Sequence, residues 1–101
     1  MDMESLSTFE LEVLESLPVE PVGLSLAEMG DGLLDDRSPA AKGRVRRALV
    51  SIERLLGSLY VRVGNDDLGG FGVRMYGMPR RRMPDVRRFF GERAGKQLVN
   101  V

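Results

Sequence analysis

Residues 38–57 are SPAAKGRVRRALVSIERLLG, and this stretch decides the fold. Ser38 is typical of a helix N-cap, Pro39 of a first helical residue and Gly57 of the residue after a last turn. At about 100° of rotation per residue, one arc is apolar and the opposite arc is cationic. The apolar arc holds Val45, Ala48, Leu49, Ile52, Leu55 and Leu56, and the opposite one holds Gly43, Arg46, Arg47, Val50 and Arg54. The stretch therefore predicts a helix with one core face and one cationic face.

Two shorter helices are predicted upstream of this one. Ser7-Thr8 begins the first, which Pro18 ends, and its apolar residues recur at helical spacing: Leu6, Phe9, Val13, Leu14 and Leu17. A second helix follows the connector Pro21 to Gly23. Ser25 and Glu28 form a capping-box pattern at its start, with Leu26, Met29 and Leu33 facing inward. Residues 35–37 predict the turn before the third helix.

A β-hairpin is predicted from two alternating runs, 59–63 and 71–76, around the Gly-rich residues 64–70. We expect a register with Arg62 opposite Arg74 and Tyr60 opposite Tyr76 on the outer face. This register would point four apolar side chains to the core: Val61, Val63, Val73 and Met75. The tyrosines then either pack across the strands or stack on a base or sugar.

The C-terminal residues predict a basic linker at 79–84 and a short helix over Asp85–Ala94, closed by Gly95. Val86, Phe89 and Phe90 share one side of that helix. The two phenylalanines either complete the core or form a dimer contact. Residues 96–101 are expected to form an extra strand or a frayed tail.

The length of 101 residues indicates a single domain, which we divide into residues 1–78 and the linker and helix of 79–101. The chain has no Cys and no His, which excludes thiolate and imidazole metal sites and the common catalytic triads and dyads. Asp66-Asp67 lacks the spacing of a calcium loop. We expect no enzymatic activity, metal or cofactor, and, since no stretch is typical of a membrane span or export signal, a cytoplasmic protein.

The charges are strongly segregated along a chain whose net charge is zero. Ten acidic residues and no basic ones occur up to Asp36, so that segment carries −10. The remainder has 15 basic and five acidic residues and carries +10, and 13 of those bases are arginine. Because the planar guanidinium group suits phosphate oxygens and guanine edges, the second segment is typical of a nucleic-acid contact.

The order of elements resembles the winged helix-turn-helix family over Ser7 to Tyr76. Residues 43–56 are similar to the family's recognition helix, with apolar-x-x-Ala-Leu-x-x-Leu followed by a strand, and Leu26-Ala27-Glu28 resembles its first-helix signature. The resemblance implies an α+β, mostly α fold. This fold has a three-helix core, a C-terminal β-hairpin wing and a short terminal helix.

The resemblance also implies double-stranded DNA as partner and a role as a transcriptional regulator or DNA-associated accessory factor. The third helix would enter the major groove through Arg46, Arg47, Val50, Ser51 and Arg54, with Arg62 and Arg74 as wing contacts. Since Asp66 and Asp67 at the wing tip would repel phosphates, the flanks of the hairpin are the expected contacts. Arg80, Arg81 and Arg82 are either a phosphate clamp beside the wing or a solubilising linker.

A protein-interaction module on the same fold is the alternative function. The contact surface would then be the acidic N-terminal face or the helix with Phe89 and Phe90, and the arginine face would be an ordinary solvated surface. A homodimer through the C-terminal helix is compatible with either function. No membrane contact is expected.

Overall fold

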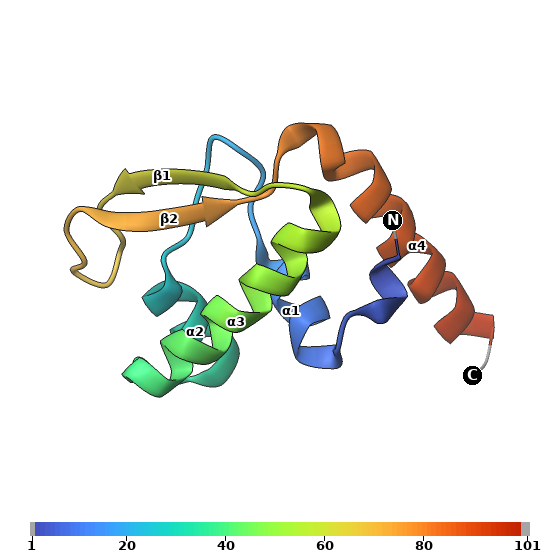
Figure 1. Cartoon of the computed structure of the whole chain (residues 1–101). Coiled ribbons are helices and arrows are strands. Elements are labelled where there is room, and N and C mark those ends of the chain that lie inside the picture. The colour runs from blue at the N-terminus through green and yellow to red at the C-terminus, as the bar shows by residue number, and fades with distance from the viewer. Residues whose placement is uncertain (1, 100–101) are drawn as a thin grey trace.

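The computed structural model describes residues 2–99, which form four α-helices and one antiparallel β-hairpin (Figure 1). Side chains are described up to residue 95. The elements, in chain order, are a 3₁₀ turn η1 (Met3–Ser5), α1 (Thr8–Ser16), α2 (Leu26–Leu34), α3 (Pro39–Leu56), β1 (Tyr60–Gly64), β2 (Val73–Gly77), a second 3₁₀ turn η2 (Arg80–Arg82) and α4 (Met83–Val99). The expected mostly helical α+β class is confirmed.

Local capping chemistry determines where the first three helices begin. Ser7, Ser25 and Ser38 each accept a hydrogen bond from the backbone N–H three residues ahead. At Ser7 and Ser25 the glutamate at that position accepts a bond from the serine N–H in return, so both capping boxes are complete. Gly57 ends α3 with a φ of 87°, a left-handed conformation that favours glycine. All four predicted signals are confirmed.

The core lies where α1, α2 and α3 pack together. The predicted apolar arc of α3 is confirmed, because Val45, Ala48, Leu49, Ile52 and Leu56 are buried, with Leu55 half-buried at its margin. α1 contributes Leu11, Val13 and Leu14, and α2 contributes Met29. Burial of these side chains holds α3 in place and leaves its opposite face in solvent.

The predicted hairpin register is wrong by one residue. Arg62 pairs with Met75, Val63 with Arg74, Val61 with Tyr76 and Tyr60 with Gly77. Since directly opposed residues share a face, Arg62 and Arg74 lie on opposite faces, as do the two tyrosines. Val61 and Val63 are 45% and 70% exposed instead of buried, whereas Met75 is buried as expected.

The connector between α1 and α2 adds backbone pairing to the free side of β2, which the sequence pattern did not indicate. Leu24 and Tyr76 exchange two backbone hydrogen bonds of 2.9 and 2.7 Å, and Val19 bridges to Met78. Figure 1 shows this connector beside the hairpin. The hairpin is thus tied to the helical core along β2, while β1 remains an edge.

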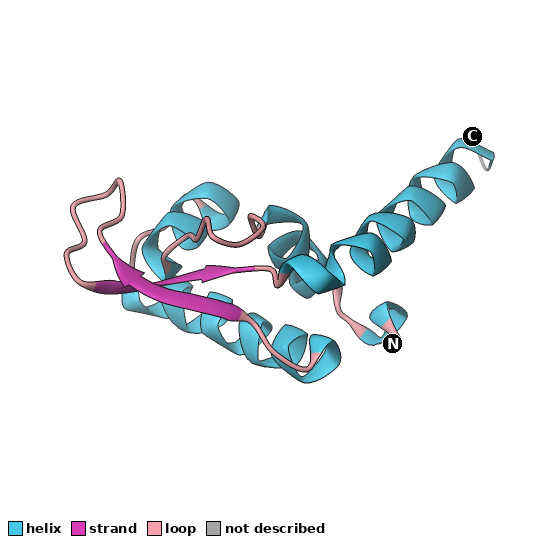
Figure 2. Ribbon diagram, turned by 90° about the horizontal axis from the view of Figure 1, so that it is seen from above, coloured by secondary structure: helices cyan, strands magenta, loops and turns pink. Residues whose placement is uncertain are grey.

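The C-terminal segment is more helical than the sequence predicts. The expected linker contains η2, and α4 begins at Met83 and continues through Gly91 and Gly95 to Val99. Residues 96–99 are therefore helical and neither strand nor frayed tail; residues 100 and 101 lie outside the described part. Val86 is buried with the core, and Figure 2 shows the far end of α4 projecting from the rest. Phe89 and Phe90 are half-buried and meet edge to face, with ring centroids 5.4 Å apart.

Within residues 2–99, none of the helices combines the length and the apolar character required of a membrane span.

Candidate nucleic-acid interface

The exposed face of α3 is cationic, as its helical periodicity predicts. Arg46, Arg47 and Arg54 are exposed, and Val50 between them is 43% exposed. None of these three guanidinium groups forms a hydrogen bond or ion pair with another side chain described by the structure. Because no carboxylate neutralises them, they present their full charge and all their N–H donors to solvent.

One margin of this face is covered by α1. The guanidinium group of Arg44 lies 4.6 Å from the centroid of the Phe9 ring, a cation–π contact. The Ser51 hydroxyl donates to the Arg47 carbonyl at 3.5 Å and faces the Glu10 carboxylate, whose pKa it lowers together with the Ser7 N–H. Ser51 is half-buried, so it lies at the edge of the cationic face beside α1.

The other margin of the face borders a groove of about 420 Å³ between α3, the start of α2 and strand β2. Three basic side chains line the groove, Lys42 and Arg46 from α3 and Arg74 from β2. Its apolar lining includes Leu26, Val73 and Tyr76. The groove therefore joins the helix arginines to one hairpin arginine in a single concave cationic surface. Lys42 is not among the contacts predicted from the sequence, although it lies one helical turn before Arg46.

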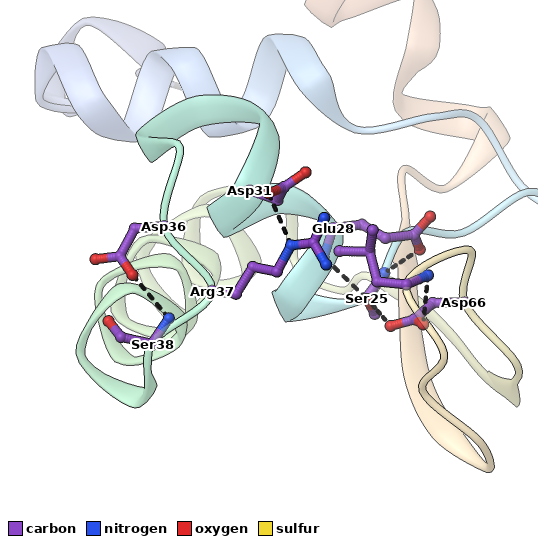
Figure 3. A network of polar contacts seen from close by, with 8 residues as sticks. Ser25, Glu28, Asp31, Asp36, Arg37, Ser38 and Asp66 are labelled. Carbon is purple, nitrogen blue, oxygen red and sulfur yellow. Dashed lines mark hydrogen bonds and ion pairs between the residues drawn. The ribbon is translucent and has the colours of Figure 1, made fainter.

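Asp66 is the acidic group of this groove, and its carboxylate is bound by the protein itself (Figure 3). Its oxygens accept hydrogen bonds from the Ser25 hydroxyl at 2.6 Å and from the backbone N–H groups of Gly70 at 2.6 Å and Leu68 at 3.0 Å. The Ser25 hydroxyl, followed by those N–H groups and the charge of Lys42, lowers the pKa of Asp66. The ionised carboxylate links the hairpin loop to the N-cap of α2.

The hairpin arginines are exposed on opposite faces of the ribbon. Arg74 lies on the face of Val63 and lines the groove, whereas Arg62 shares its face with Met75. The guanidinium group of Arg62 extends over Gly64, since a Cβ added there would stand 2.6 Å from its Nη1. Gly64 thus leaves room for Arg62 to reach toward the loop. The prediction that Arg62 and Arg74 lie on the same face of the hairpin is therefore wrong.

The three consecutive arginines of η2 are bonded within the protein. The backbone N–H of Arg80 donates to the Glu20 carboxylate at 2.7 Å, and its guanidinium group donates to the Glu20 carbonyl at 3.1 Å. Arg81 donates to the Ser58 hydroxyl at 2.8 Å. Arg82 donates through Nε to the Leu56 carbonyl at 2.8 Å and lies 4.0 Å from Asp85. These bonds hold η2 against the end of α3 and the α1–α2 connector.

The arginines predicted as nucleic-acid contacts therefore fall into two groups. Arg46, Arg47, Arg54, Arg62 and Arg74 bond to no other described side chain, while Arg80, Arg81 and Arg82 serve the fold. No signal in the sequence separates these groups, because the partners of Arg80, Arg81 and Arg82 lie far from them along the chain. Comparison of the chain with protein-family models, curated proteins and solved structures gives no match.

Proposed function

We propose that the protein is a winged-helix DNA-binding protein, acting as a transcriptional regulator or DNA-associated accessory factor. The observation that carries the proposal is the row of unneutralised arginines on the exposed face of α3, continued across a groove by Arg74 of the hairpin. A helix of this kind has the diameter that the major groove of B-DNA accepts. The order α1, α2, α3, hairpin, with the connector paired to β2, supports a winged-helix arrangement.

Each contact residue has a role that follows from its position. Arg46 and Arg47, on the exposed face of α3, read base edges, with Val50 in apolar contact and Arg54 toward the phosphates. Arg62 and Arg74 hold phosphates from the two faces of the hairpin. Ser51 is a marginal contact beside α1. We assign Arg80, Arg81 and Arg82 to the fold rather than to DNA, because each is hydrogen-bonded within the protein.

The test is binding to random-sequence duplex DNA, measured by fluorescence anisotropy at roughly 50 and 200 mM salt. Three to five phosphate contacts predict an affinity that falls roughly 40- to 500-fold between these conditions, because each contact releases counterions. The double variant Arg46→Ala/Arg47→Ala is expected to lose binding.

Arg87→Ala/Arg88→Ala is the matched control. It removes the same charge from two exposed residues of α4, away from the proposed surface, and is expected to keep most of the affinity. Absence of wild-type binding at low salt would refute DNA binding. Equal losses in both double variants would show that net charge, rather than the α3 face, governs the affinity.

A protein-interaction role is the second candidate function, favoured by α4. Phe89 and Phe90 are half-buried and the helix projects from the molecule, so a second copy or another protein can pack against it. Light scattering of the full chain over a range of concentrations tests the homodimer. A dimer of this kind that also binds DNA predicts two half-sites about one helical turn apart.

A further inference from the structure

Phe71, at the end of the hairpin loop, is the most exposed large apolar side chain among residues 2–95. It is 86% exposed, against 70% for Val63, the next in order. A phenylalanine ring removed from water contributes several times the burial free energy of a methyl group. A ring of this size held outside the core is available for contact with another molecule.

The hairpin loop, residues 65–72, holds the ring on an ordered backbone. The Asp66 carboxylate accepts bonds from Leu68, Gly70 and Ser25, and the Asp66 N–H donates to the Gly70 carbonyl at 3.0 Å. The Asn65 side chain accepts a bond from the Gly72 N–H at 3.2 Å. Because the loop is already ordered, little conformational entropy is lost when it binds. Its anchoring to α2 fixes where the ring lies relative to α3.

The charges around the ring match a groove of duplex DNA. Arg62 and Arg74 project from the two opposite faces of the ribbon, and the Arg62 guanidinium group reaches over Gly64 toward the loop. A hairpin entering a groove end-on meets a phosphate wall on each side and base edges at the floor. A cation on each face and an exposed aromatic ring in the loop between the strands fit those three surfaces.

Two further features favour DNA over a protein partner. Gly70 and Gly72 flank the ring and carry no side chains that would keep a backbone or sugar away. The carboxylate of Asp66, which the sequence suggests would repel phosphates, is instead turned inward and bound by Ser25, so that Asp67 is the exposed acid of the loop. Val61 and Val63, which are also exposed, lie on β1 rather than in the loop that holds the ring.

We propose that Phe71 is a wedge residue, whose ring enters the minor groove next to the major groove occupied by α3 and partly unstacks one base step. This inference rests on the DNA-binding function proposed above. Insertion of an apolar side chain between two base pairs costs free energy, because it partly unstacks them. The bent duplex then contacts more of the protein surface, which offsets that cost. Steps of pyrimidine followed by purine unstack most easily, so the ring selects sites that contain them.

The absence of tryptophan in the chain gives a direct test. Phe71→Trp places a single indole in the hairpin loop, and Val22→Trp places one at another exposed apolar position, in the α1–α2 connector. At saturating duplex, the emission of the indole at position 71 is expected to be quenched by the bases and protected from acrylamide. The indole at position 22 is expected to stay accessible. Continued access of acrylamide to position 71 in the bound complex would overturn the proposal.

Affinity measurements separate this inference from the proposed function. Phe71→Ala is expected to bind duplexes rich in TA steps roughly 5- to 150-fold more weakly, the range for loss of one aromatic–base contact. Phe71→Leu, which retains an apolar wedge, is expected to keep most of the affinity. Wild-type binding with an unchanged Phe71→Ala affinity would refute the wedge and leave DNA binding intact. Absence of wild-type binding would refute both.

Discussion

Asp66 shows how one side chain can be read incorrectly from its position in the sequence. Within a Gly-rich loop it predicts an exposed acid that repels phosphates. In the structure it accepts three hydrogen bonds and lies against the N-terminus of α2, where the helix dipole favours a negative charge. Gly70 makes this possible, because a Cβ there would stand 2.7 Å from the Asp66 carboxylate.

Replacement of Ser25 by alanine is expected to raise the pKa of Asp66 toward its usual value. Ser25 is the largest cause of the lowered pKa, and its hydroxyl also caps α2. Because the folded-state pKa is depressed, the stabilisation is present above the unfolded-state pKa and is lost as the pH falls through the folded-state value. The change is expected to lower the free energy of unfolding at neutral pH by about 1–2 kcal/mol, through loss of the N-cap.

NMR titration of the Asp66 carboxyl carbon and the Gly70 amide measures this pKa in the wild type and in Ser25→Ala. The Asp36 carboxylate provides an internal reference, since its own lowered pKa comes from Ser38 and not from Ser25. Identical Asp66 titration curves in both proteins would contradict the assigned role of Ser25.

At the level of the elements, η2 connects three parts of the molecule. Its arginines bond to the connector, to the residue after Gly57 and to the last turn of α3. The carbonyl of Leu56 lies in the last turn of α3, where carbonyls have no N–H partner within the helix. The Arg82 guanidinium group supplies this carbonyl with a donor and places a positive charge at the negative end of the helix dipole. Arg82 therefore fixes the end of α3 relative to α4.

Arg82→Ala is expected to lower the free energy of unfolding by about 1–2 kcal/mol, because it removes a partly buried charged donor from a carbonyl. Arg81→Ala is expected to have a smaller effect, since its bond to Ser58 is exposed. Urea unfolding measures both. When the two proteins are compared at equal concentrations of folded protein, Arg82→Ala is expected to bind DNA with nearly the affinity of the wild type. A large loss of affinity without loss of stability would return Arg82 to the phosphate contacts.

For the whole molecule, one core spans the three-helix bundle and the start of α4. Val86 is 4% exposed and belongs to the same buried cluster as Leu14, Leu17 and Met78. This packing brings acidic residues of the segment up to Asp36 close to basic residues of the remaining chain. The exposed acids of α1, Glu12 and Glu15, lie beside Phe90 and Arg93 of α4, away from the groove of Arg46 and Arg74.

Val86→Ala tests whether α4 and the bundle unfold together. Loss of two buried carbon atoms is expected to lower the free energy of unfolding by about 1–3 kcal/mol and the midpoint of thermal unfolding by roughly 4–8 °C per kcal/mol. Circular dichroism is expected to show a single transition that shifts as a whole. The exposed Val61→Ala serves as control and is expected to shift it little. A separate early transition in Val86→Ala would show that α4 folds independently.

The sequence alone was sufficient to predict where the first three helices begin and where α3 ends, because caps act over three residues and the apolar pattern of α3 extends over several turns. It also determined which face of α3 is exposed. Tertiary structure decided the hairpin register, since an eight-residue loop closes more than one pairing and a shift of one residue exchanges the faces. It decided the length of α4, where contacts of Val86 and the phenylalanines outweigh the low helix propensity of Gly91 and Gly95. Finally, it decided which arginines are bonded inward and which face solvent, because the partners of Arg80, Arg81 and Arg82 lie 60, 23 and 26 residues away along the chain.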